Sequence, residues 1–252
     1  MNTWWKQYLT SPIINTIGQY KERRHFSKPP ILIGGCGRSG TSLLLSILSA
    51  HPNIHAIPVE TDAFTNWDQS GKPLRKDRFY RELIKQRIKP SANRWCEKRP
   101  YNVRFIPEIL NYFDQARFIH LVRDPRAVCT SIHPINAGAY WIPIDRYVQD
   151  VTMGLEFVEH PQVLTIRFED LLAREQITLK KILDYLDEPL SPEIENWVDH
   201  ATVRIHNAWA QKIQPLDPNV LDKWQEEKHQ KRVQDLLKDK RVIDIMKIFN
   251  YE

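Results

Sequence analysis

The amino-acid sequence predicts an α/β fold in which helices flank a mostly parallel sheet. Short apolar runs alternate with helical patterns, which is typical of βαβ units. A glycine-rich turn separates the first apolar run from an apolar helix. The chain has 252 residues, 42% of them hydrophobic, and contains no internal repeat or low-complexity linker. A single domain therefore accounts for residues 1–252.

Within that domain the chain divides into three parts. We expect a polar, basic leader over residues 1–28, a core over residues 31–225 and a C-terminal helical segment over residues 226–252. The expected buried strands, all short and apolar, run from Ile31 to Ile33, from Phe118 to Val122 and from Val163 to Ile166.

Helices are expected between and after these strands. The first runs from Thr41 to Ala50 and stops at His51-Pro52, because proline cannot continue a helix. Asp124-Pro125 and Ser191-Pro192 each offer an N-cap followed by proline at the first helical position. The other expected helices cover residues 78–89, 103–113, 169–186 and 221–252.

Residues 78–89 form a basic amphipathic pattern with Phe79 and Leu83 on one side. Such a pattern is either a solvated helix face, which is the usual case, or a lining for an acidic acceptor. The sequence leaves open whether residues 62–94 are ordered without an acceptor.

Composition narrows the class of protein. Lysine plus arginine (36) exceeds aspartate plus glutamate (31) by 5, which is mild for a nucleic-acid binder but suits a partner carrying phosphate or sulfate. No apolar run approaches the ~20 residues that span a bilayer, and no secretory signal is expected. Cys36, Cys96 and Cys129 are widely spaced and form no C-x-x-C pair. We expect a cytoplasmic protein with no metal site and no nucleic-acid partner.

The strongest chemical signal is GGCGRSGTS over Gly34 to Ser42, between a strand and a helix. Aligned on Gly35 it reads G-x-x-x-x-G-T-S, a P-loop-like turn in which Thr41 replaces the Walker lysine. Its backbone N–H groups and the following helix N-terminus would bind an anion, and Arg38 would add a planar fork of donors. Without the lysine, transfer of an ATP γ-phosphate with Mg²⁺ is disfavoured.

Two further groups point to the same region. Arg123 follows the second predicted strand, so it is expected beside the glycine turn at the carboxyl edge of the sheet. Ser131 lies about two helical turns after Asp124 and would face the same way. Lys98, after Trp95 and Cys96, is either a surface lysine or a catalytic cation.

Together these features resemble the sulfotransferases that use 3′-phosphoadenosine-5′-phosphosulfate (PAPS), and the motif pattern is closest to the tyrosylprotein sulfotransferases and related bacterial enzymes. The family's P-R-S-G-T-T is matched by Gly37 to Ser42, its A-H-P by Ala50 to Pro52 and its V-R-D-x-R-A by Val122 to Ala127. Later matches are Phe168 to Leu171 with Y-E-x-L, Leu179 to Leu186 with L-K-x-I-L-D-x-L and Leu221 to Trp224 with L-x-K-W.

The resemblance implies a role for each matched residue. The donor's 5′-phosphosulfate would be held by Arg38, Ser39, Gly40, Thr41 and Ser42, and its 3′-phosphate by Arg123 and Ser131. Lys98 matches the lysine of the family's N-K-D-P and would contact the oxygen that bridges sulfate to the leaving phosphate. Charge grows on that oxygen as the S–O bond breaks, so a cation there binds the transition state best.

The resemblance also suggests a general base. The family's E-E-T-R is represented by Val59, Glu60, Thr61 and Asp62, with one residue inserted, which makes Glu60 the candidate base. Other branches use histidine, so His55, His120 and His133 stay open, although His120 alternates with apolar residues and fits a buried strand better.

The expected activity is transfer of a sulfuryl group from PAPS to an acceptor hydroxyl, with adenosine 3′,5′-bisphosphate (PAP) as product and no metal. The acceptor is a small molecule, a carbohydrate, a lipid or a tyrosyl peptide, and the oligomeric state is undetermined. The alternatives are a P-loop nucleotide kinase or NTPase with an atypical loop, and a non-catalytic nucleotide-binding module.

Overall fold

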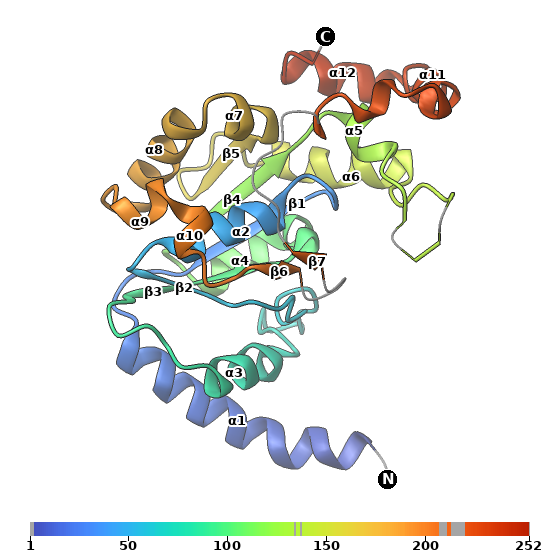
Figure 1. Ribbon diagram of the computed structural model, residues 1–252. Helices are drawn as coiled ribbons and strands as arrows, with labels where there is room; N and C mark the ends of the chain where they lie inside the picture. The colour runs from blue at the N-terminus through green and yellow to red at the C-terminus, as the bar shows by residue number, and fades with distance from the viewer. Residues whose placement is uncertain (1–2, 134, 137, 207–210, 213–219, 252) are drawn as a thin grey trace.

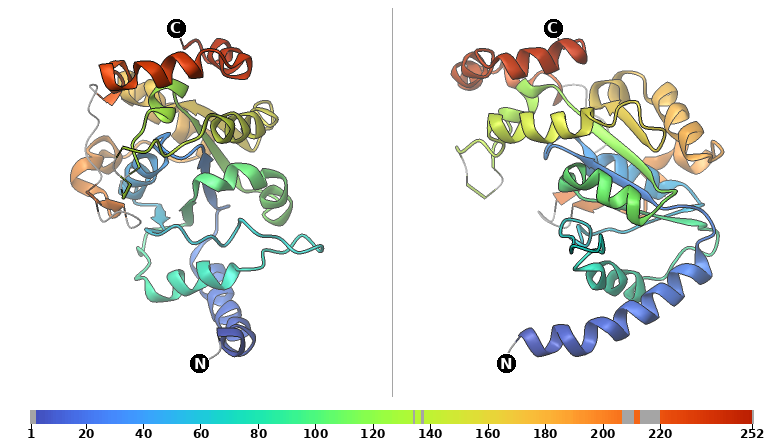
Figure 2. Two further views of the ribbon diagram at one scale, coloured as in Figure 1. Left: turned by 90° about the vertical axis from the view of Figure 1, so that its right-hand side faces the viewer. Right: turned by 180° about the vertical axis from the view of Figure 1, so that it is seen from behind.

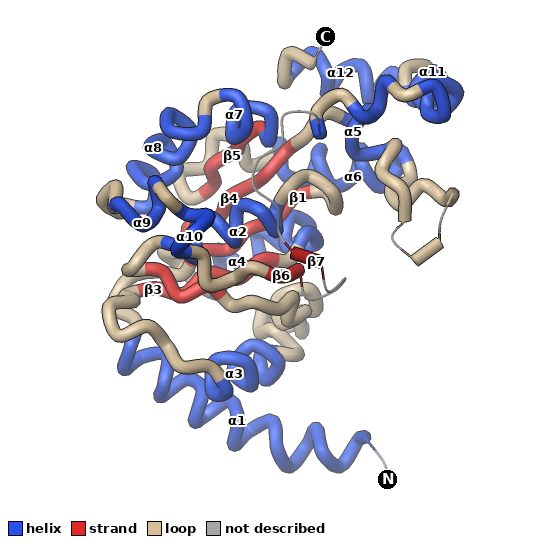
Figure 3. The backbone as a smooth tube through the Cα atoms, in the orientation of Figure 1, coloured by secondary structure: helices blue, strands red, loops and turns tan. Residues whose placement is uncertain are grey.

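Five parallel strands form the central sheet of the computed structural model, in the order β2-β3-β1-β4-β5 (Figure 1). The structure describes residues 3–133, 135–136, 138–206, 211–212 and 220–251. The strands are β1 (Ile31–Gly35), β2 (Ile54–Ala56), β3 (Arg94–Lys98), β4 (Arg117–Val122) and β5 (Val163–Arg167). Helices cover both faces of this sheet (Figure 3). The predicted α/β fold with a mostly parallel sheet is therefore confirmed.

Strands β2 and β3 were not predicted, because neither is an apolar run. Strand β2 has three residues, and β3 reads RWCEK, with charged side chains at three of five positions. All five residues of β3 are nevertheless buried. Arg94 is accommodated because its Nη1 donates to the carbonyl of Leu186 (2.5 Å) and its Nε lies 3.6 Å from Glu188. Such pairing is what allows charge inside a sheet.

The position of β1 in the sheet decides where the glycine turn lies. Strand β3 pairs with one edge of β1, Lys98 being opposite Ile33, and β4 pairs with the other edge, Leu121 being opposite Gly35. Strand order therefore changes direction at β1, and ligands of open α/β sheets bind at the carboxyl end of such a strand. The turn after β1 consequently emerges between Lys98 and Arg123.

The core follows the two-residue period of the strands. Ile31 and Ile33 face a cluster with α2 (Thr41–Ala50) and α8 (Glu175–Leu186), whereas Leu32 faces the opposite cluster with Phe118. That second cluster includes the 3-10 helix η1 (Pro100–Phe105), α4 (Ile106–Tyr112) and α3 (Lys76–Lys85). Phe79 and Leu83 of α3 are buried there, as the amphipathic pattern predicted.

Several predicted helices are present with different bounds. The region expected to be helical over residues 103–113 begins as η1, and that over residues 169–186 is divided into α7 (Phe168–Ala173) and α8. Ser191-Pro192 begins α9 (Pro192–Glu195), which is followed by α10 (Trp197–His200). Within residues 220–251 the C-terminal segment is broken into η3 (Lys223–Gln225), η4 (Glu227–His229), α11 (Gln230–Leu236) and α12 (Lys240–Ile248). A two-stranded sheet joins β6 (Ile205–His206) to β7 (Gln211–Lys212).

Residues 1–28 contain more structure than the predicted leader. Helix α1 (Thr3–His25) runs along α3, and its first turns lie farther from the sheet than its last (Figures 1 and 2). Glu22 anchors α1, because its carboxylate accepts hydrogen bonds from the Tyr80 hydroxyl (2.8 Å) and the Trp95 indole (2.7 Å). These partners are more than fifty residues away in sequence, so local patterning did not reveal the helix. Among the described residues, no helix has the length and apolarity needed to cross a bilayer.

Candidate active site

The glycine turn presents the polar features of an anion site. The first N–H groups of any α-helix have no partner within the helix. Helix α2 begins at Thr41, and no side-chain cap takes the place of that partner. Ser39 is buried, and among the described residues its Oγ has no hydrogen-bond partner. Gly40 has φ = 91°, and a Cβ there would lie 2.3 Å from the ring of Phe168. Glycine is therefore required at this position, and the backbone can curl around an anion.

Arg38 and Arg123 meet at this turn. The Nη1 group of Arg123 donates to the carbonyl oxygen of Arg38 (3.1 Å), and its Nη2 donates to the carbonyl oxygen of Val220 (2.9 Å). The guanidinium of Arg123 lies 4.5 Å from the ring centroid of Phe168, and that of Arg38 lies 5.4 Å from the ring centroid of Trp141. The loop and the tip of β4 thus bring two guanidinium-bearing residues together, as the strand order requires.

Burial changes the acidity of Arg123 without removing its charge. Loss of solvent lowers the pKa of Arg123 to about 10, with Glu169 opposing the shift and Arg38 adding to it. The group is still cationic at neutral pH. Two neighbouring cations at the carboxyl ends of the adjacent strands β1 and β4 favour a ligand with more than one negative charge.

The helix carrying Ser131 is shorter than predicted. Helix α5 (Pro125–Cys129) begins at the predicted cap, where Oδ1 of Asp124 accepts from the backbone N–H of Arg126 (2.7 Å), but it ends before Ser131. The hydroxyl of Ser131 donates to the carbonyl oxygen of Ala127 (3.0 Å). The expected two-turn helical placement of Ser131 is therefore wrong, and its part in donor binding stays a prediction.

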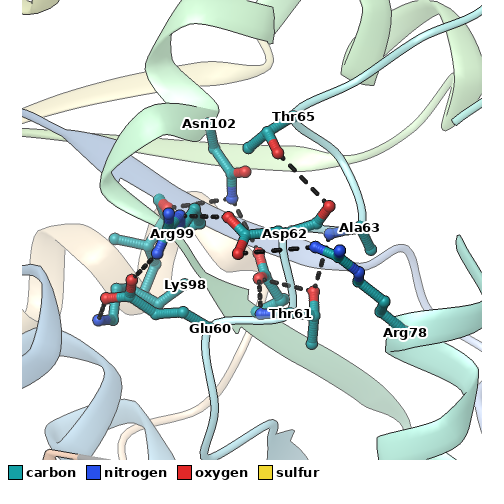
Figure 4. Close-up of polar contacts among 11 residues, drawn as sticks. Glu60, Thr61, Asp62, Ala63, Thr65, Arg78, Lys98, Arg99 and Asn102 are labelled. Carbon is teal, nitrogen blue, oxygen red and sulfur yellow. Dashed lines mark hydrogen bonds and ion pairs between the residues drawn. The ribbon is translucent and has the colours of Figure 1, made fainter. Parts of the chain in front are cut away.

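Lys98 and Glu60 contact each other directly (Figure 4). Lys98 ends β3 and is 4% exposed, whereas Glu60 belongs to the loop that follows β2. Glu60 also pairs with Arg99, so its two carboxylate oxygens meet two different cations. The structure thus joins the candidate base to the candidate catalytic cation, although they are 38 residues apart in sequence.

The electrostatics of Glu60 favour its ionised form. Burial on its own would raise the pKa of Glu60, but the charges and hydrogen bonds of Lys98 and Arg99 outweigh it and lower the pKa below the ordinary 4.5. Arg99 in turn lies between Glu60 and Asp62, with 2.7 Å from its Nε to Oδ1 of Asp62 (Figure 4). Glu60 is therefore a carboxylate at neutral pH.

The sulfotransferase family model matches residues 29–192. This span contains the turn, Glu60, Lys98 and Arg123. The chain belongs to the sulfotransferase family.

Curated relatives of this sulfotransferase-family chain are protein-tyrosine sulfotransferases. The one from Drosophila melanogaster is 25% identical over 78% of this chain and 47% of its own length. Protein-tyrosine sulfotransferase 1 of Danio rerio is 24% identical over 78% of this chain and 65% of its own length. The chain thus spans about half to two thirds of the length of these relatives.

Solved structures of a sulfotransferase domain and of retinol dehydratase share the fold. The sulfotransferase domain from the curacin biosynthetic pathway has a TM-score of 0.63 at 18% identity, covering 90% of this chain and 99% of that domain. Retinol dehydratase, solved in complex with androsterone and PAP, has a TM-score of 0.52 at 16% identity, covering 87% of this chain and 82% of its own.

The candidate site contains a buried carboxylate, Glu97, that the sequence analysis did not single out. Glu97, on β3, is 1% exposed and accepts hydrogen bonds from the Thr61 hydroxyl (3.1 Å) and from Nδ2 of Asn102 (2.8 Å). Burial raises the pKa of Glu97, with the hydrogen bonds from Asn102 and Thr61 opposing the shift. The hydrogen bond between Glu97 and Thr61 therefore joins the neighbour of Lys98 to the neighbour of Glu60.

The three histidines considered as alternative bases lie in surroundings that differ from those of Glu60. His120 is fully buried in β4, and burial lowers its pKa to about 4. His55 faces Gln86 (3.0 Å), and burial likewise lowers its pKa to about 4. Nδ1 of His133 accepts from the backbone N–H groups of Ile135 (3.2 Å) and Asn136 (3.1 Å). Of the four candidates, Glu60 is the one for which the structure gives a contact with Lys98.

The segment from Leu221 to Trp224 lies beside the start of α5. Trp224 packs under Arg126, whose Cζ lies 4.2 Å from the indole centroid, and Arg126 pairs with Asp124 (2.7 Å).

Over the described residues, no group of three or more histidine, cysteine, aspartate or glutamate side chains is arranged to hold a metal ion.

Proposed function

We propose that this chain transfers a sulfuryl group from PAPS to an acceptor hydroxyl and releases PAP. The observation that carries the proposal is the contact between Lys98 and Glu60 beside a glycine turn that lacks the Walker lysine. Family membership supports the reaction class. No observation favours the kinase or NTPase alternative.

The residues present suit a donor with anionic groups at both ends. The first turn of α2, the Ser39 hydroxyl and Arg38 would hold the 5′-phosphosulfate, with Gly40, Thr41 and Ser42 supplying backbone donors or hydroxyls. Arg123, with Ser131, would hold the 3′-phosphate. Ser39 Oγ, which has no hydrogen-bond partner among the described residues, and the uncapped start of α2 are polar groups suited to a ligand.

The transfer step assigns separate tasks to Glu60 and Lys98. When bound, PAPS supplies the sulfuryl group, and the 5′-phosphate of PAP is the leaving group. Glu60 accepts the proton of the acceptor hydroxyl as the acceptor oxygen bonds to sulfur. Lys98 donates to the bridging oxygen, which takes the electron pair as its bond to sulfur breaks. An ammonium has three donors, so Lys98 can keep its contact with Glu60 while it does this.

The acceptor is proposed only as a class. A hydroxyl on a tyrosyl peptide, a carbohydrate or a small molecule fits the reaction, and the curated relatives are named for protein tyrosine. Because the chain spans only part of those relatives, their substrate is not carried over.

Calorimetry tests the donor. PAP should bind without divalent metal and more tightly than ATP with Mg²⁺, since the turn lacks the lysine that reaches ATP phosphates. ATP binding that requires Mg²⁺ together with absent PAP binding would refute the proposal and support an NTPase.

Two substitutions then separate an enzyme from a binding module. Glu60→Gln and Lys98→Met should each lower turnover from PAPS by about 100-fold or more. Glu60→Gln should leave PAP affinity within a few-fold, because Glu60 holds no phosphate. Lys98→Met should weaken PAP binding far less than it lowers turnover, because Lys98 contacts the 5′-phosphate only at the bridging oxygen. Wild-type protein that binds PAP but transfers no label to any of a phenol, a sugar and a tyrosyl peptide would support the non-catalytic module.

A further inference from the structure

Tyr101, in η1, is surrounded by arginine side chains. The Cζ atoms of Arg104 and Arg146 each lie 4.7 Å from its ring centroid, and that of Arg99 lies 5.5 Å away. Arg146 comes from α6 (Ile144–Leu155), so two separate segments converge on one ring. A tyrosine ring attracts each cation through its face, and the ring therefore orders guanidinium groups that would otherwise repel one another.

In the part of the chain that the structure describes, carboxylates neutralise only part of this charge. Nε of Arg104 lies 2.5 Å from Oδ1 of Asp150, and Nε of Arg146 lies 3.6 Å from its Oδ2. Arg99 already faces Glu60 and Asp62. Asp150 is 1% exposed and serves both remaining arginines, so two guanidinium groups share one carboxylate.

Both arginines are open to a ligand. Their side chains are 23% (Arg104) and 21% (Arg146) exposed. The excess positive charge is thus accessible, and a guanidinium fork matches carboxylate and phosphate groups equally well.

The cluster borders the proposed reaction centre on two sides. On one side, a Cβ built on Gly37 of the glycine turn would lie 3.2 Å from Nη2 of Arg146. On the other, Arg99 links Tyr101 to Glu60. An acceptor whose hydroxyl meets Glu60 therefore lies close to Tyr101 and its arginines.

We propose that Arg104 and Arg146, ordered by Tyr101, bind an anionic group of the acceptor, a carboxylate or a phosphate. The inference rests on the proposed function and adds the chemical class of the acceptor. Arg38, Arg123 and the N–H groups at the start of α2 already serve the donor in the proposed function, so the remaining charge serves the second substrate. The preferred acceptor is a hydroxyl compound with an acidic substituent.

The test measures binding to PAP-saturated protein by calorimetry, using matched acid and ester pairs. Suitable probes are 4-hydroxyphenylacetate and its methyl ester, 4-hydroxybenzylphosphonate and its dimethyl ester, and 3-hydroxybutyrate and its methyl ester. For at least one scaffold the acid should bind ten-fold or more tightly than the ester. The carboxylate and phosphonate arms distinguish the two sources of negative charge.

Substitutions identify the residues that cause the preference for the acid over the ester. Arg104→Met and Arg146→Met should reduce the acid-to-ester ratio to about two or less while PAP affinity stays within two-fold, and Arg146→Lys should retain part of the ratio. Arg117→Met is the matched control, because Arg117 also lies over a tyrosine (Tyr185, 5.3 Å) and pairs with one carboxylate (Asp187, 2.9 Å), but at the start of β4. Its ratio should match wild type.

Three outcomes would overturn the inference. Wild-type protein that binds acid and ester equally, or binds neither on any scaffold, has no anion subsite. If Arg146→Met weakens the binding of PAP as strongly as the binding of the acid, Arg146 belongs to the donor site. Loss of the ratio in Arg117→Met would mark a general charge effect. Failure of wild-type protein to bind PAP is a separate result, which refutes the proposed function instead.

Discussion

The Nε atom of Arg99 lies 2.7 Å from Oδ1 of Asp62, and this ion pair joins the loop of Glu60 to the end of the strand that carries Lys98. Both residues depart from the family patterns: Asp62 stands where E-E-T-R has arginine, and Arg99 stands where N-K-D-P has aspartate. Each departure reverses a charge, and the two reversed charges meet. The pair therefore supports the alignment, with its one inserted residue, that identified Glu60.

The Asp62–Arg99 pair should be energetically coupled. Asp62 has φ = 52°, so Asp62→Asn removes the charge while keeping a residue that tolerates this backbone. Asp62→Asn and Arg99→Gln should each lower turnover, and the double variant should lose less than the sum of the two. The expected coupling is about 0.5 to 1 kcal/mol, because both side chains are partly exposed. A double-mutant cycle on kcat/KM measures it, and strict additivity would show that the contact has no role.

Arg123 should distinguish nucleotides by their 3′-phosphate. Arg123→Ala removes a charge-assisted contact worth about 1.5 to 3 kcal/mol, so PAP affinity should fall ten-fold or more. The affinity for AMP, which lacks that phosphate, should change little. Calorimetry with both ligands checks the assignment. Equal losses would mean that Arg123 acts by holding the carbonyl groups of Arg38 and Val220.

Glu97 should act by positioning Glu60. Glu97→Ala leaves the donors of Thr61 and Asn102 unpaired in a buried site, which costs about 1 to 3 kcal/mol for each group. Turnover should fall at least ten-fold with PAP affinity retained, and Glu97→Gln should restore part of it.

A pH profile separates this role from a merely structural one. The low pKa of Glu60 depends on Lys98 and Arg99, so a displaced Glu60 should have a higher pKa. The acidic limb of kcat/KM should then move to higher pH in Glu97→Ala. An unmoved limb in a folded variant would show that Glu97 supports the fold alone.

His120 should make the fold sensitive to acid. Its pKa is about 4 in the folded chain against 6.5 ordinarily, so the neutral ring stabilises the fold above pH 6.5 and this stability is lost as pH falls toward 4. For this residue alone the free energy of unfolding should be about 2 kcal/mol lower at pH 5 than at pH 7.5. Denaturant unfolding at both pH values tests this. His120→Gln, even if less stable, should show a smaller difference between the two pH values, and an unchanged difference would assign the effect to other groups.

Sequence by itself determined the glycine turn, the strands β1, β4 and β5, and the identity of the residues expected to hold the donor. These features are local: an apolar run, glycines at fixed spacing and an arginine directly after a strand are all visible within a few residues. Only the tertiary structure decided that RWCEK is a central strand, since its charges are tolerated through partners such as Leu186 and Glu188. It also decided that Glu60 meets Lys98 and that Arg104 and Arg146 share Tyr101. Those contacts join segments far apart in the chain, and charge and burial there depend on packing that no short pattern contains.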